Sequence, residues 1–208
     1  MEIENGKVKI TKTKLMLAEG RDAELFLVWA CRKYYSGQDV QVMDFGGVNE
    51  LPNFLKLLSS DESYAQVKSV VIARDAENNV KSAVESITSA MQQTGMPVPS
   101  KPFEYAQANS LRSAFMIFPG PNHKEGTLED LCLLTVEDDN AMECVNDFFK
   151  CVKKRGESLP RCHKNRLHCF LSGKDKFVGS SIGQASYKGA WDPDHSALAP
   201  FKAIIEQI

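Results

Sequence analysis

Apolar residues in the first 120 positions fall alternately into short continuous runs and into sets with helical spacing. Short apolar runs are typical of buried strands, and spacings of three and four residues are typical of helices that bury one face. The run at 67–73 (VKSVVIA) is the strongest, because its β-branched residues favour a central parallel strand. The pattern predicts strands at 14–18, 40–43, 67–73 and 113–118, and helices at 21–35, beyond Gly47 and at 80–93.

Repeated strand-then-helix units are typical of a mostly parallel sheet with helices on its faces. We therefore expect an α/β fold with about four mostly parallel strands, in a core that spans 1–136. From 137 the pattern is helical, which predicts a C-terminal extension, 137–208, packed on the core as one structural unit. Helices are expected at 128–134, 141–154, from about 161, and at 196–208, with a loop region at 172–194.

The net charge of the chain limits the ways in which it can bind nucleic acid. A net charge of -2 and a pI near 6.1 give no overall attraction to a polyanion. Binding of that kind would need a local basic patch or bridging metal ions. One basic cluster is present, and it is interpreted either as a solvated face or as a patch for a phosphate backbone: Lys150, Lys153, Lys154, Arg155, Arg161, Lys164 and Arg166.

The start of the chain, MEIENGKVKITKTK, has no apolar segment of the kind found in signal peptides, and no apolar window approaches 18 residues. We therefore expect neither secretion nor membrane insertion and place the protein in the cytoplasm. The six cysteines are then interpreted as reduced thiols.

Acidic residues follow three of the predicted strands. Glu19 comes directly after the first strand, Asp75 and Glu77 follow the third, and Glu129 and Asp130 follow the fourth across a short loop. The carboxyl ends of parallel strands form one edge of a sheet, where ligands bind. Carboxylates gathered there repel one another unless a cation neutralises them, and Mg²⁺ takes carboxylate and phosphate oxygens as ligands. The pattern therefore predicts a divalent-metal site.

Each of these acids also has a structural interpretation. Glu19 would be an acid near a helix N-terminus, and Asp75 or Glu77 would cap the helix that follows. The segment TLED at 127–130 fits a capping box with Thr127 at the N-cap. The common location of the acids at one edge is what favours a metal site over separate structural roles.

Two segments resemble the motifs of TOPRIM domains, which occur in bacterial primases, topoisomerases and OLD-type nucleases. Residues 17–22 (LAEGRD) resemble the strand–Glu–Gly motif, and 70–77 (VVIARDAE) resemble the hydrophobic strand that carries an Asp-x-Asp motif. The segments 126–131 (GTLEDL) and 189–192 (GAWD) are similar to a small bacterial TOPRIM-related group. The resemblance extends over most of the chain, from about residue 12, and is best in the first 135 residues.

The resemblance implies metal-dependent phosphodiester chemistry on nucleic acid, DNA or RNA, with Mg²⁺ or Mn²⁺ as cofactor. It implies that Glu19 is the acid/base or metal-adjacent glutamate and that Asp75 and Glu77 are metal ligands. Glu129 matches an additional acidic position of the OLD-type nucleases. These enzymes also use a downstream lysine to stabilise charge at the phosphate, and the candidates here are Lys164, then Lys174 and Lys176.

Two departures from the motifs leave other functions open. The family often places a second acid four residues after the glutamate, where this chain has Ala23, so Asp22 or Glu24 would have to substitute. The second motif is Asp-x-Glu, whose glutamate is one methylene longer. The alternatives are therefore an inactive TOPRIM-derived module that binds nucleic acid or protein, and a subunit that is active only with a partner ATPase.

Further candidates lie outside the strand ends. Arg74 precedes Asp75, and His123 lies in a polar loop that leads to Glu129; both are candidate substrate-binding residues. Four cysteines form two pairs with a spacing of seven, which is wider than most structural zinc sites use, so we expect them at the edge of the core: Cys144, Cys151, Cys162 and Cys169. The residues beside them that define the expected buried stripe are Ala141, Val145, Phe148 and Val152.

Overall fold

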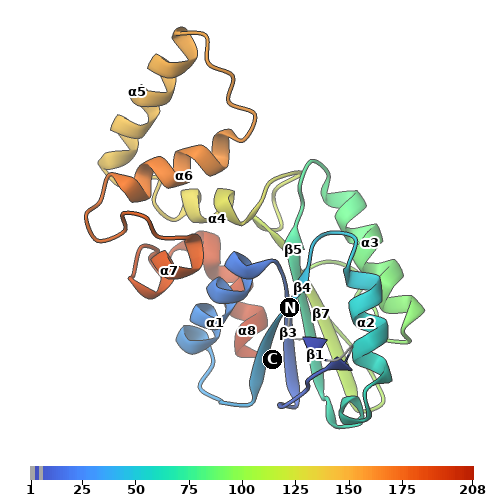
Figure 1. The fold of residues 1–208 in the computed structure, drawn as a ribbon. Coiled ribbons are helices and arrows are strands. Elements are labelled where there is room, and N and C mark those ends of the chain that lie inside the picture. The colour runs from blue at the N-terminus through green and yellow to red at the C-terminus, as the bar shows by residue number, and fades with distance from the viewer. Residues whose placement is uncertain (1–2, 5–6) are drawn as a thin grey trace.

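A computed structural model describes residues 3–4 and 7–208 of the chain. In this part of the chain the main sheet has five strands in the order β4-β3-β5-β7-β6 (Figure 1). Strands β3, β4, β5 and β7 run parallel, and β6 pairs antiparallel with β7 at one edge. The bounds are β3 (Lys14–Glu19), β4 (Val40–Gly46), β5 (Ser69–Asp75), β6 (Tyr105–Ala108) and β7 (Leu111–Phe118), with a small separate pair, β1 (Ile3–Glu4) and β2 (Lys7–Val8).

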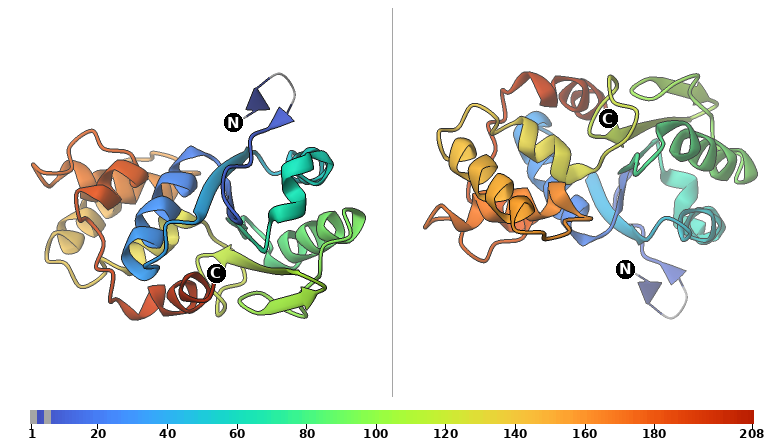
Figure 2. Two further views of the ribbon diagram at one scale, coloured as in Figure 1. Left: turned by 90° about the horizontal axis from the view of Figure 1, so that it is seen from below. Right: turned by 90° about the horizontal axis from the view of Figure 1, so that it is seen from above.

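Side chains that alternate along each strand supply two cores, one on each face of the sheet. One face packs on α2 (Leu51–Ser60) and α3 (Val80–Gln93), through strand residues such as Leu17, Ile72 and Phe115. The other face packs on α1 (Arg21–Tyr34) and α8 (Ala199–Glu206), and α7 (Ile182–Tyr187) packs against α1 (Figure 2). The sheet is therefore the middle layer of three.

Three further helices lie beyond the carboxyl edge of the sheet. Helix α4 (Leu128–Leu134) follows β7 after a loop at 119–127, and α5 (Ala141–Lys154) and α6 (Cys162–Ser172) form a hairpin that projects away from the sheet (Figure 1). Short 3-10 segments lie at η1 (Glu62–Gln66) and η2 (Ser196–Leu198). Buried residues of α4, α5 and α6 belong to the same core as those of α1. No described helix is long and apolar enough to cross a membrane.

The α/β fold with its mostly parallel sheet, predicted from the sequence, is confirmed, and α3 and α4 lie at the predicted residues. Strand β6 was not predicted, because its YAQA sequence is only partly buried and lacks an apolar run. Helix α7 lies inside the segment 172–194, which was predicted as a loop. The stripe predicted on α5 was wrong at Phe148, which is 54% exposed, whereas the neighbouring Phe149 is buried.

Helix α7 depends on a close approach to α1. A Cβ placed on Gly183 would lie 2.2 Å from the Cβ of Leu25, and the Gly183 amide donates to the Asp22 carboxylate at 3.2 Å. We expect Gly183→Ala to lower the free energy of unfolding by about 1–3 kcal/mol, because the two helices would have to move apart. Urea denaturation measures this, and Gly173→Ala is the control, since a Cβ there meets nothing closer than 3.5 Å. Equal stability of the two variants would contradict the prediction.

Candidate functional site

The candidate site begins where β3 and β5 end side by side, at Glu19 and Asp75. The turn after Glu19 is held by Asp44 of β4, whose Oδ1 accepts from the amides of Gly20 at 2.9 Å and Gly46 at 2.7 Å. Gly20 has a φ of 85°, a conformation that favours glycine. The Glu-Gly sequence therefore supplies both a carboxylate and the turn into α1.

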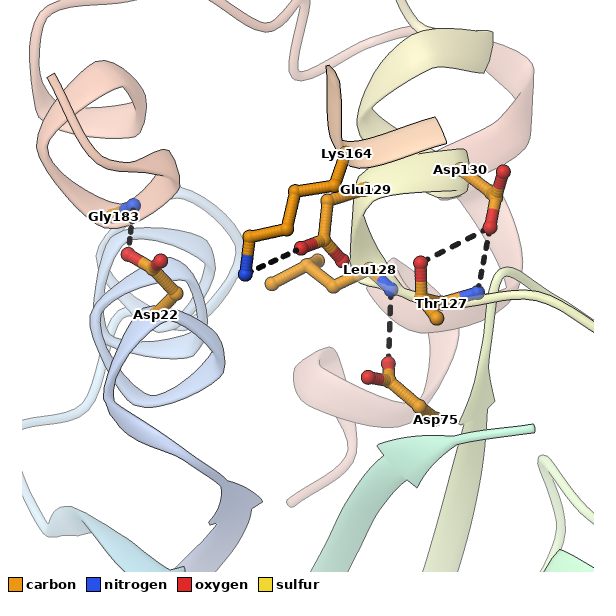
Figure 3. A network of polar contacts seen from close by, with 8 residues as sticks. All are labelled: Asp22, Asp75, Thr127, Leu128, Glu129, Asp130, Lys164 and Gly183. Atoms are coloured by element: carbon orange, nitrogen blue, oxygen red, sulfur yellow. Dashed lines mark hydrogen bonds and ion pairs between the residues drawn. The ribbon is translucent and has the colours of Figure 1, made fainter. Parts of the chain in front are cut away.

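Asp75 is the most perturbed carboxylate in this region. Its Oδ1 accepts from the backbone amide of Leu128 at 2.9 Å, at the start of α4 (Figure 3). Burial raises the pKa of Asp75 to about 8, with the negative charges of Glu19, Glu129 and Glu77 adding to the effect and the Leu128 amide opposing it. Asp75 thus lies among three of the other acids that the sequence singled out, Glu19, Glu77 and Glu129.

The structural interpretations of the acids are partly confirmed. Asp75 does not cap the helix that follows it, because Asn79 accepts from the first amides of α3; it caps α4 instead. The capping box is confirmed at Thr127 and Asp130, whose carboxylate accepts from the Thr127 amide at 2.9 Å. The capping roles around α4 therefore belong to Asp75 and Asp130 and not to Glu129.

Arg74 lies directly behind Glu19. Its Nε is 3.3 Å from Glu19 Oε2, an ion pair without the alignment of a hydrogen bond, and its Nη1 donates to Ser86 Oγ at 3.1 Å. Burial raises the pKa of Glu19, while the charge of Arg74 opposes that rise. Since Arg74 is only 4% exposed, we assign it to neutralising Glu19 rather than to contacting a substrate.

Lys164 reaches the carboxylates from a distant part of the sequence. Its Nζ is 3.6 Å from Glu129 Oε1, so that α6 contributes a cation above the acids at the sheet edge (Figure 3). Of the other two candidates, Lys174 pairs with Asp139 at 2.6 Å and Lys176 lies over the ring of Phe177. Lys164 is therefore the predicted lysine that the structure brings to the site.

Asp22 is the acid that stands near Glu129 from the α1 side. Figure 3 shows its side chain on the far side of Lys164, where it accepts from the Gly183 amide. Glu24, the other possible substitute for the acid missing at Ala23, is buried and pairs with Arg21 at 2.6 Å. Asp22 is thus the better placed of the two, and its position depends on α7, which the sequence did not predict.

A pocket of about 740 Å³ opens beside the acids, between α4, α5, α6 and the loops after β5 and β7. Glu77 lines it from a left-handed backbone conformation (φ 52°), fixed by two backbone hydrogen bonds with Gly126. His123 lines the same pocket, so the structure brings two of the predicted residues together there. Its other polar side chains, which the sequence reasoning did not connect to the site, include Asn78, Asn146, His163 and Arg166.

A family model described as "Protein of unknown function (DUF3226)" matches residues 13–208, nearly the whole chain. The chain belongs to the DUF3226 family. No curated protein and no solved structure matches it. The chemistry of this DUF3226 chain therefore has to be argued from the geometry of its own residues.

The oxygen donors of this DUF3226 chain suit a hard divalent cation in two respects. Glu19 Oε2 is buried without a hydrogen bond, and burial, together with the charges of the nearby acids, raises the pKa of Asp75. A bound cation would give the Glu19 oxygen a partner and would stabilise the charged form of Asp75. Within residues 3–4 and 7–208, however, no three His, Cys, Asp or Glu side chains already stand in a metal-binding arrangement. The acids would therefore have to rearrange locally to share an ion.

The cysteines lie away from these acids. Cys144 and Cys151 are exposed, and Cys162 and Cys169 are partly buried. The prediction that all four lie at the edge of the core was thus wrong for the two cysteines of α5, because α5 buries its other side, through Met142, Val145 and Phe149.

Substitution of the adjacent acids Glu129 and Asp130 is expected to affect different properties, metal binding for Glu129 and stability for Asp130. Asp130→Ala removes the capping box and should lower the free energy of unfolding by about 0.5–2 kcal/mol. Glu129→Ala removes only a partly exposed ion pair, so stability should change by less than about 0.5 kcal/mol, while binding of Mg²⁺ weakens. Urea denaturation and calorimetry on both variants test this; a larger stability loss in Glu129→Ala would contradict the assignment.

Proposed function

We propose that the chain performs Mg²⁺- or Mn²⁺-dependent phosphodiester chemistry on nucleic acid in the cytoplasm, as a TOPRIM-type nuclease would. The observation that carries the proposal is the convergence of Glu19, Asp75 and Glu129 at one edge of a parallel sheet, with Lys164 beside them. Sites at this edge are the usual ligand sites of open α/β sheets. The resemblance of the segments 17–22 and 70–77 to TOPRIM motifs agrees with it.

Each residue has a role that follows from its position. Asp75, Glu77 and Glu129 would hold the ion with Glu19, and the ion would supply neutralisation of phosphate charge and a positioned water. Glu19, whose pKa is raised by burial, accepts a proton from the attacking water. Lys164, which is 46% exposed, is free to approach a phosphate while it remains near Glu129. His123 contacts the substrate from the neighbouring pocket.

The proposal is tested by calorimetry with Mg²⁺ and Mn²⁺ and by a nuclease assay on the same samples. We expect Asp75→Ala to lose metal binding and to cleave DNA and RNA at least about 100-fold more slowly than wild type, since it removes a ligand at the centre of the acids. Asp147→Ala is the control, because that acid is exposed on α5 and pairs with the exposed Lys150. Unchanged binding and cleavage in Asp75→Ala would refute the nuclease proposal.

A second candidate is a module without catalytic activity that binds nucleic acid or protein. It is favoured by the ion pairs Arg74–Glu19 and Lys164–Glu129, which already neutralise two of the acids, and by Ala23. This candidate predicts binding that survives chelation and the Asp75→Ala change. A subunit that needs a partner ATPase predicts metal binding but no cleavage by the isolated chain.

A further inference from the structure

The charge of the chain is concentrated in one place. Residues 148–166, which we call the arm, contain seven Lys or Arg residues and one Glu, a net charge of +6. Because the whole chain carries -2, the remaining residues carry -8. The arm consists of the end of α5, the loop that follows and the first half of α6, and it projects from the sheet (Figure 1). Such asymmetry is typical of a surface that meets a polyanion.

The cations at the tip of the arm, residues 153–161, are exposed to solvent. Lys153, Lys154, Arg155 and Arg161 are all exposed, and within the described part of the chain none of the four takes part in an ion pair. By contrast, Lys150 is held by Asp147 at 2.9 Å. Three consecutive exposed cations repel one another, so an anionic partner would stabilise the tip.

An exposed aromatic ring lies near these cations. Phe148 is 54% exposed and precedes Lys153–Arg155 by about two helical turns, roughly 10 Å along the axis. It borders a groove of about 430 Å³ between α5 and α6 that is mostly lined by apolar side chains, among them Val152 and Leu159. Surfaces that bind single strands typically combine cations along the path of the phosphate backbone with an aromatic ring on which a base stacks.

We infer that the arm binds a single strand of nucleic acid, with phosphates against Lys153, Lys154 and Arg155 and a base stacked on Phe148. The bases of a duplex are already stacked on both faces, so they cannot use the ring in this way. A membrane surface would need a broad apolar face, and Phe148 is the large exposed apolar residue that the described arm offers. The same arm carries Lys164, 3.6 Å from Glu129, so a bound strand leads toward the acids.

The inference takes its substrate class from the proposed function, but binding is measured without metal and therefore without cleavage. Fluorescence anisotropy in EDTA follows labelled 12-nucleotide oligothymidylate and oligouridylate from 50 to 200 mM KCl. In the variant Lys153→Glu/Lys154→Glu/Arg155→Glu we expect affinity to fall at least about 10-fold. The plot of log affinity against log salt should become less steep by about 2, because each phosphate contact contributes about 0.7 to its negative slope.

The matched control carries the same change in net charge on exposed residues elsewhere, Lys56→Glu/Lys68→Glu/Lys81→Glu, and should bind almost as wild type does. Equal losses in the two triple variants, or no binding by wild type, would overturn the inference. Circular dichroism confirms that both variants are folded. Binding that persists in Asp75→Ala, while cleavage shows no dependence on Asp75, would reject the nuclease proposal and leave the arm in place.

Phe148→Ala separates stacking from charge. We expect it to weaken binding of the single strand about 5- to 100-fold at every salt concentration, without a change in salt slope, and to leave binding of a 12-base-pair duplex unchanged. An equal effect on the duplex would overturn the assignment to a single strand. Binding to vesicles that contain phosphatidylserine, with none to either oligonucleotide, would show that the surface meets a membrane and would also overturn it.

Discussion

Asp75→Asn is expected to stabilise the metal-free protein and to abolish its metal-dependent chemistry. Asparagine has the same shape and can still accept from the Leu128 amide through its Oδ1, but it carries no charge to be buried among Glu19 and Glu129. The shift of the Asp75 pKa from 3.8 to about 8 corresponds to at most roughly 5–6 kcal/mol, at about 1.4 kcal/mol per pKa unit. We expect a gain in the free energy of unfolding of about 2–4 kcal/mol at pH 8.

The gain should depend on pH in a definite direction. Below about pH 4 the carboxyl is protonated in both the folded and unfolded states, so the wild type and Asp75→Asn differ little. Between about pH 4 and 8 the unfolded chain releases the proton and the folded protein keeps it, which lowers the stability of wild type as pH rises. Above about pH 8 the carboxyl is ionised in both states, so the difference in free energy of unfolding between wild type and Asp75→Asn becomes constant.

Urea denaturation in EDTA at several pH values from 4 to 9 measures this difference for wild type and Asp75→Asn. Addition of Mg²⁺ should then stabilise wild type and leave the variant unchanged, because only the wild type has the carboxylate that the ion would bind. Asp147→Asn, on the exposed face of α5, should alter neither stability nor the response to Mg²⁺. A variant that is less stable than wild type at pH 8 would show that the Asp75 charge is not a cost to the fold.

The sequence allowed the acids to be predicted together because their convergence follows from topology. Glu19 and Asp75 end adjacent parallel strands, and such strand ends share an edge whatever the details of packing. Asp75 was correctly considered a cap, but of the wrong helix, since its partner Leu128 is 53 residues away. A local pattern cannot show which helix start a side chain will meet through tertiary structure.

The rest of the candidate site depends on packing over long sequence separations. Lys164 meets Glu129 only because α6 folds back over α4, and Asp22 is held by Gly183, 161 residues further along. The segment containing α7 is rich in Gly and Ser, so its helix is decided by the capping box at Ser181 and by contact with α1 rather than by a strong apolar pattern. Arg74, a predicted substrate-binding residue, is buried and pairs with Glu19, a contact that its place in the sequence does not indicate.

Arg74→Ala is expected to be among the most destabilising single changes in the chain. Arg74 is 4% exposed and forms an ion pair with Glu19, whose side chain is only 11% exposed. Removing the guanidinium leaves a buried carboxylate without its partner, which typically costs about 3–5 kcal/mol. The pKa of Glu19 should rise further, because the charge of Arg74 opposes the rise that burial causes. Urea denaturation at pH 7 measures the loss of stability.

A second set of variants separates the charge of Arg74 from its packing. Arg74→Met keeps most of the side-chain volume, yet it should still be strongly destabilising at pH 7, because Glu19 must then either be buried as an unpaired charge or take up a proton. The double variant Arg74→Met/Glu19→Gln should recover a large part of the loss, since the unpaired charge is then gone, whereas Ser86→Ala should cost no more than about 1 kcal/mol for one hydrogen bond. If the double variant were as unstable as Arg74→Met, the role of Arg74 would be packing, and Glu19 would carry no buried charge that needs a partner.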